Sequence, residues 1–166
     1  MSRYSTVVAA SILFCVIISS CSSKEKVIGL GENIHHDDFE YSVRSIEQTD
    51  RIGNVHARGT FYVVTFRVES RARRVDHRWS NTIAYIVDES GSKYENNMDV
   101  QKELDRISPF DFKNEYVTPA GATETTMLVF DLPREAKHPY LQVRGWLMMG
   151  DVFDGSQYKK TKVKLF

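Results

Sequence analysis

Residues 60–69, TFYVVTFRVE, are the stretch that decides the fold. β-branched and aromatic residues dominate it, and apolar side chains recur at every second position from Tyr62 to Val68. Because successive side chains of a strand point to opposite faces, this alternation predicts a strand with one wholly apolar face. This β-branched and aromatic composition favours a central strand over an edge strand.

Further strand patterns lie on both sides of this segment. Turn formers separate them: Gly and Asn within residues 50–59, Asp-Glu-Ser-Gly-Ser at 88–92, and Pro-Ala-Gly at 119–121. Only residues 99–106 suggest a short helical turn. The sequence therefore predicts an all-β class and an immunoglobulin-like β-sandwich of about seven strands. The flanking strand patterns cover residues 39–44, 82–88, 93–94, 123–132, 140–147 and 158–166.

The order of these features resembles the telokin-like, immunoglobulin-fold domain of unknown function found in bacterial lipoproteins and secreted proteins. The resemblance spans about residues 39–143 and implies a fold, since no chemical motif accompanies it. The chain departs from the family pattern after the central strand, where Ser70 and an Arg-rich loop replace the usual Asn. The matching features are the strand 59–64 running into 66–68, the hairpin 87–94, the turn 119–121 and the closing strand 128–133.

The first twenty residues differ in composition from the rest of the chain. Arg3 is followed by an apolar run over residues 7–18 and then by small polar residues. A helix needs roughly 20 apolar residues to cross a bilayer, and this run is shorter. Residues 1–20 are therefore predicted to be a cleavable export signal.

The end of this segment resembles a bacterial lipoprotein signal, whose pattern is aliphatic, small, small, Cys. Residues 18–21 read Ile-Ser-Ser-Cys, whereas Phe14 is too large for cleavage before Cys15. The resemblance implies a diacylglycerol on the Cys21 sulfur and a further acyl chain on its amino group, which together anchor a protein stably to a membrane. An ordinary secretory signal with a chance cysteine is the alternative. Ser22 in place of Asp resembles the sorting pattern for the outer membrane where the host has two membranes, so the predicted location is the cell envelope.

The mature chain is long enough for one domain. Residues 21–38 are polar and contain Gly, which predicts a flexible tether, and residues 39–166 are predicted to form the sandwich. The 22 basic and 22 acidic residues give no bulk electrostatic case for nucleic acid or for an anionic membrane surface as a partner. Cys15 and Cys21 are the two cysteines, so disulfides, Cys-ligated zinc and a cysteine nucleophile are excluded from residues 39–166.

Histidine and carboxylate residues cluster at 35–38, His-His-Asp-Asp, and such side chains can bind zinc, copper or nickel. His56, His77 and His138 lie in predicted loops and are possible additional ligands. Adjacent residues of an extended chain point in different directions, however, and the spacing of a metal-binding helix or knuckle is absent from the sequence. A solvated tether is the competing interpretation, and we predict no metal and no cofactor.

Two other clusters suggest contact with a partner. The first is an arginine cluster, which forms either a basic patch for anionic lipid headgroups or phosphorylated sugars, or simply a solvated connection. It consists of Arg71, Arg73, Arg74 and Arg78, beside Trp79. Apolar side chains on loops either close the core or form a contact surface. These are Ile107, Pro109, Phe110, Phe112 and Tyr116, and also Met148 and Met149 next to Gly150 and Asp151.

No catalytic motif is present in the sequence: it lacks Gly-x-Ser-x-Gly, His-Glu-x-x-His and a Gly-rich phosphate loop. The sequence therefore predicts that the protein is not an enzyme. The expected function is that of a membrane-anchored, non-enzymatic immunoglobulin-like module that binds another protein or supports an envelope complex. The alternatives are an envelope ligand-binding or metal-binding protein and, less favoured, a hydrolase with paired carboxylates.

Overall fold

The strand predicted over residues 60–69 lies at the centre of the structure, a computed structural model that describes residues 25–144 and 157–166. It forms the second half of a longer strand, β4 (Val55–Ser70). β4 hydrogen-bonds to a neighbouring strand along each of its edges. The prediction of a central strand is confirmed.

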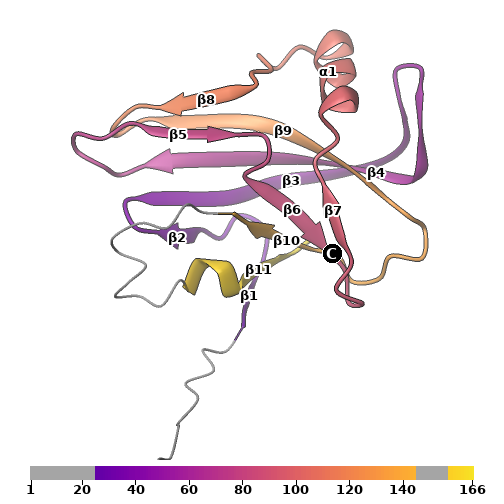
Figure 1. The fold of residues 1–166 in the computed structure, drawn as a ribbon, viewed down its shortest axis with the longest axis horizontal. Coiled ribbons are helices and arrows are strands. Elements are labelled where there is room, and N and C mark those ends of the chain that lie inside the picture. Colours follow the sequence, from indigo (N-terminus) through magenta and orange to yellow (C-terminus); the bar gives the residue numbers. More distant parts are fainter. Residues whose placement is uncertain (1–24, 145–156) are drawn as a thin grey trace, which may run out of the picture.

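β4 belongs to a four-stranded antiparallel sheet (Figure 1). Its pairing with β3 is interrupted between Val43 and Ser45 and again between Thr49 and Arg51. Irregularities of this kind bend a strand and increase its twist. The strands lie side by side in the order β2 (Ile34–His36), β3 (Phe39–Ile52), β4 and β9 (Thr123–Leu132).

A second sheet has five strands, most of them short. β1 runs parallel to β11, and the other neighbouring strands run antiparallel. The first and last strands of the described chain are thus held side by side. In spatial order the strands are β1 (Lys26–Ile28), β11 (Thr161–Lys164), β10 (Tyr140–Val143), β6 (Ala84–Val87) and β7 (Lys93–Glu95).

A two-stranded sheet and two helices complete the described structure. Asn97 caps the α-helix, because its side chain accepts a hydrogen bond from the backbone N–H of Val100 at 3.2 Å. This ten-residue helix is longer than the single turn predicted near residues 99–106. The elements are β5 (His77–Ser80) paired with β8 (Glu115–Thr118), the helix α1 (Met98–Ile107) and the 3-10 helix η1 (Gln157–Lys160).

One core joins the three sheets. Val64 and Phe66 of β4, Ile86 of β6 and Leu141 of β10 are all fully buried within it. A smaller apolar cluster under α1 includes Val100 and covers the other face of the four-stranded sheet. The prediction of an all-β sandwich is confirmed. The described residues form eleven strands instead of about seven, because several strands are only three or four residues long.

The flexible tether predicted for residues 21–38 is wrong for the part of it that the structure describes. Residues 26–28 form β1 and residues 34–36 form β2. Ile28 is 4% exposed and Ile34 is 1% exposed, and both pack in the main core. Strands of three residues are too short to show an alternating pattern in the sequence. The predicted signal at 1–20, Cys21 and the group Met148, Met149, Gly150 and Asp151 lie outside the described residues.

Ile34→Ala should therefore destabilise the domain by about 2–5 kcal/mol, since it removes a side chain buried in the core. Ile107→Ala is the matched control, because Ile107 is 49% exposed; its effect should stay within about 0.5 kcal/mol. Chemical denaturation of both variants measures the difference. Equal midpoints would show that β2 does not belong to the cooperative unit.

Candidate functional site

The structure does not bring the residues of the 35–38 cluster to one site. His35 is exposed, and its Nδ1 lies 3.7 Å from the Glu40 carboxylate. His36, the next residue of β2, is 2% exposed and faces the core beside Tyr41. Asp37 has a positive φ of 54° in the turn that follows. Among the residues that the structure describes, no group of three or more His, Cys, Asp and Glu could hold a metal ion.

The other histidines are also separated from this cluster. His56 lies on β4 and His77 begins β5, so their predicted loop positions are wrong. His138 lies in the loop before β10, with a positive φ of 47°. Its Nε2 is 3.8 Å from Glu89.

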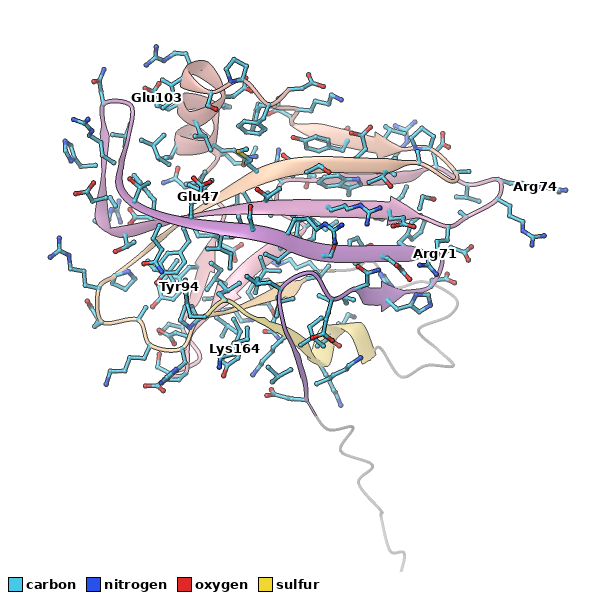
Figure 2. The ribbon with its side chains drawn as sticks, turned by 180° about the vertical axis from the view of Figure 1, so that it is seen from behind. Glu47, Arg71, Arg74, Tyr94, Glu103 and Lys164 are labelled. Atoms are coloured by element: carbon cyan, nitrogen blue, oxygen red, sulfur yellow. The ribbon has the colours of Figure 1, made fainter. Side chains whose placement is uncertain are left out.

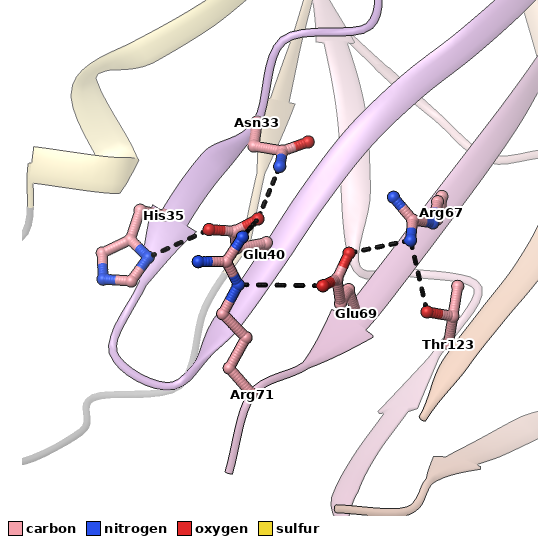
Figure 3. A network of polar contacts seen from close by, with 7 residues as sticks. All are labelled: Asn33, His35, Glu40, Arg67, Glu69, Arg71 and Thr123. Atoms are coloured by element: carbon pink, nitrogen blue, oxygen red, sulfur yellow. Dashed lines mark hydrogen bonds and ion pairs between the residues drawn. The ribbon is translucent and has the colours of Figure 1, made fainter. Parts of the chain in front are cut away.

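The arginine cluster is divided between different roles. Arg71 turns back onto the sheet, where its guanidinium lies 2.9 Å from the buried Glu40 carboxylate and 3.7 Å from Glu69 (Figure 3). Because a buried carboxylate needs a partner, Arg71 stabilises the fold at this point. Arg74 instead projects into solvent from the loop after β4 (Figure 2). Arg78 is exposed on β5, so the structure does not gather these cations into one patch.

Tyr116 lies on β8 and faces the core, so its predicted loop position is wrong. It is 2% exposed, and its ring stacks on Trp79 with a centroid distance of 4.2 Å. Phe110 and Phe112 are half-buried, and their backbone N–H groups donate to the Asp105 carboxylate at 2.8 and 3.3 Å. Ile107 and Pro109 are exposed.

A recess of about 290 Å³ opens beside the Trp79–Tyr116 stack. It lies where β3, the segment from β5 to β6, and the end of β10 meet. Its walls combine aromatic and apolar surface with hydroxyl and imidazole groups. The lining residues of this recess are Tyr41, His77, Trp79, Ser80, Thr82, Ile83 and Arg144.

His77 and Tyr41 form the inner wall of the recess. The Tyr41 hydroxyl and His77 Nε2 are hydrogen-bonded at 3.0 Å, and the ring of Phe39 stacks on the imidazole with a centroid distance of 4.0 Å. Burial, and to a smaller extent the nearby His36, lower the pKa of His77 from 6.5 to about 4. His77 is therefore uncharged at neutral pH.

The remaining polar groups of the recess are also fixed by partners. Trp79 Nε1 donates to the Thr118 hydroxyl at 2.9 Å, which sets the orientation of the indole ring. The Arg144 guanidinium pairs with Glu95 and lies 4.8 Å from the centre of the Tyr85 ring. Since Glu95 balances the one cation in the wall, the recess favours an uncharged group.

The recess is lined in part by β5, through His77, Trp79 and Ser80. Among the described strands, β5 hydrogen-bonds only to β8. No residue of β8 lines the recess, so the recess lies away from that partner.

Sequence reasoning named His77 and Trp79 but missed the rest of the recess. The hydroxyl of Tyr41 meets His77 across 36 positions of sequence. A third segment of the chain contributes Arg144, whose backbone N–H donates to the Ile83 carbonyl at 2.6 Å. The alternation around residues 39–44 indicates that Tyr41 is buried, but it carries no signal for what lies across the core.

Comparison with known proteins identifies the fold and no family. No family model and no curated protein matches the chain. The yjhA protein of Bacillus subtilis is 11% identical, covering 83% of this chain and 98% of that one with a TM-score of 0.56. A secreted protein of Mycobacterium tuberculosis is 12% identical over 76% and 94%, with a TM-score of 0.52. An uncharacterized β-sandwich protein of Clostridium difficile is 12% identical over 86% and 95%, with a TM-score of 0.51.

These identities are low enough that the likeness extends to the β-sandwich fold alone. Among the described residues, no helix is long and apolar enough to cross a membrane.

Replacing His77 should change how stability depends on pH. Its pKa is near 6.5 in the unfolded chain and about 4 in the folded domain. As the pH falls from about 6.5 to about 4, only the unfolded chain takes up this proton, so folding loses up to about 3 kcal/mol. His77→Gln should remove that part of the pH dependence, as measured by urea unfolding at several pH values. Parallel profiles for the two proteins would contradict this assignment.

Proposed function

We propose that this chain is a lipid-anchored protein of the cell envelope whose sandwich, of telokin-like immunoglobulin type, is a non-enzymatic binding module. The anchor is proposed from the signal pattern that ends at Cys21. The likeness to a secreted protein of similar fold is consistent with an exported chain. The host's outer membrane is the proposed location where the host has two membranes.

The recess beside β5 is the observation that carries the binding role. An extended segment of a partner protein can add by backbone hydrogen bonds to the edge of β5 that no described strand pairs with. One of its uncharged side chains would then enter the recess against Trp79 and Ile83. Buried anchor residues of this kind supply much of the binding energy of protein interfaces.

The state of the polar groups supports binding over catalysis. The imidazole of His77 is committed to Tyr41, and the hydroxyl of Ser80 is hydrogen-bonded to that of Thr82 at 2.8 Å. No carboxylate is among the described lining residues of the recess. A nucleophile with its base, or a pair of carboxylates, is therefore missing from that lining.

A small uncharged ligand is the alternative occupant. The recess, at about 290 Å³, is near the lower limit of about 300 Å³ for small-molecule sites. Its mixture of aromatic surface and hydroxyl groups suits a compact molecule with both apolar and hydrogen-bonding parts.

The lipid anchor can be tested directly at Cys21. Mass spectrometry of the processed chain, purified from membranes in detergent, should show acyl chains on an N-terminal Cys21. Cys21→Ser should abolish that mass and prevent processing at this position. Recovery of an unmodified chain from the soluble fraction of the envelope would contradict the anchor.

The recess can be tested by filling it. Thr82 is exposed at its rim, so Thr82→Trp should block the recess and leave the core unchanged. Cross-linking in intact envelopes should then yield about tenfold less partner adduct, given typical anchor-residue energies. Thr125→Trp, at an exposed position of β9, is the control and should behave as wild type.

If the occupant is a small molecule, native mass spectrometry of the purified chain should instead show a bound mass that Thr82→Trp removes. Identical cross-linking of all three proteins, with no bound mass in any of them, would contradict the binding role.

A further inference from the structure

A second recess adjoins the one beside the Trp79–Tyr116 stack, which we now call the first recess. The second has a volume of about 340 Å³, and its described lining residues are Arg78, Trp79, Ser80 and Glu115. Trp79 and Ser80 also line the first recess. The two recesses therefore meet at the Ser80 end of β5. We call the second one the charged recess, because its walls include Arg78 and Glu115.

The pairing of β5 with β8 places the two charged residues on the outward face of this small sheet. Arg78 is paired with Val117, and Ser80 is paired with Glu115. Along both strands these outward residues alternate with buried ones. Arg78 and Glu115 are thus diagonal neighbours, a relation in which side chains lie about 7–8 Å apart. A cation and an anion share one face of the sheet but are offset from each other.

Neither charge is compensated within the described structure. The ion pairs among the described residues include neither Arg78 nor Glu115, and both side chains are exposed. Asp76, two residues before Arg78, accepts a hydrogen bond from the backbone N–H of Ala120 at 3.3 Å. Because no internal ion pair has to break, both charges are available to a ligand.

A strand added to β5 would present its side chains to the two recesses in turn, since successive side chains point to opposite faces of a sheet. Trp79 is buried on the face that packs in the core. A side chain opposite Trp79 would therefore face the first recess. The side chains before and after it would lie opposite Arg78 and Ser80, on the outward face of the sheet.

Charge complementarity then defines the chemistry of these two flanking residues. A residue opposite Arg78 lies about 5 Å from it, where opposite charges stabilise a cross-strand pair and like charges destabilise it. An acidic residue is favoured there. The residue opposite Ser80 faces Glu115 across that small side chain, at two strand spacings or about 10 Å. A lysine or an arginine is favoured at this position, because its long side chain can reach the carboxylate.

We propose that the segment recognised at β5 carries opposite charges on the two sides of the residue that enters the first recess. This inference rests on the proposed function and names the chemistry of the partner, an extended peptide with an acidic, an uncharged and a basic residue in succession. The acidic residue comes first if the segment runs parallel to β5, and the basic residue comes first if it runs antiparallel. Arg78 and Glu115 are then the residues that determine specificity.

Five fluorescent heptapeptides test this pattern. They have the form Thr-Thr-X-Leu-Z-Thr-Thr with blocked ends, and they differ only at the two positions that flank the leucine. X and Z are Glu and Lys, Lys and Glu, Glu and Glu, Lys and Lys, or Gln and Gln. Threonine favours an extended strand and adds no charge. Fluorescence anisotropy measures the affinity of each peptide for the processed chain, purified in detergent.

One of the two peptides with opposite charges should bind about threefold more tightly than the peptides with like charges or with none. Because exposed charge pairs are screened by salt, this preference should fall at about 0.5 M salt, where the Debye length is about 4 Å. Equal affinity of the wild-type chain for all five peptides would overturn the proposal.

Exchanging the two charges gives a sharper test. Arg78→Glu with Glu115→Arg keeps the net charge of the chain, and it should make the other peptide with opposite charges the preferred one. An unchanged preference in this variant would overturn the proposal. The matched control is Asp99→Lys with Lys102→Asp, an exchange of an exposed pair on α1 that should keep the wild-type preference.

Thermal melting shows whether each exchanged variant is folded. If the exchange at β5 prevents folding, the single variants Arg78→Gln and Glu115→Gln replace it. Each removes one charge at an exposed position and should lower the preference for the peptide with opposite charges. A full preference in both single variants would contradict the role of the charged recess.

Failure of the charged recess and failure of the proposed binding role give different results. Thr82→Trp fills the first recess and should weaken the binding of all five peptides. Peptides that bind equally well to the wild type, but less well to Thr82→Trp, would leave the binding role standing and overturn the role of the two charges. No binding of any peptide at about 1 mM, the weak end of measurable affinities, would contradict both strand addition at β5 and this proposal.

Discussion

Hydrogen bonding along both edges of β4 is the constraint on which the rest of the structure depends. β4 and β3 are the two longest strands, at 16 and 14 residues, and β9 occupies the remaining edge of β4. Once this sheet has formed, its apolar face must be covered. The strands of the second sheet supply that cover, although none is longer than four residues. Strands this short are not stable alone, so their order depends on the core that they complete.

Much of the fold could be predicted, and the errors have a common physical origin. Strands such as β4 and β9 are long enough for period-2 alternation to be visible, whereas β1, β2, β5 and β8 are not. Residues 22–38 therefore showed no apolar periodicity and were predicted to be a tether, although Ile28 and Ile34 are core residues. The recess could be predicted only in part, because three distant segments contribute to it.

Several clusters that suggested chemistry serve the fold instead. Consecutive residues of a strand point to opposite faces, so His35 reaches solvent while His36 enters the core. Arg71 compensates the buried charge of Glu40, and His77 fills a polar position in the core beside Tyr41. Arg71 and His77 thus each satisfy a buried polar group that would otherwise lower stability. In a β-protein, histidines, arginines and carboxylates that lie close together in sequence are therefore weak indicators of a functional site until the sheet face on which each side chain lies is known.

The parallel pairing of β1 with β11 also affects the order in which the domain can be assembled. A chain emerges from its N-terminus, so β1 is delivered first of the described strands and its partner β11 last. Contacts between such distant segments are slow to form, because a long loop must close before they contribute. β3, β4 and β9 can pair earlier, whereas β1 cannot pair until residues 161–164 have been synthesised. Closure of the five-stranded sheet is thus a late step in folding, and one that a truncated chain cannot complete.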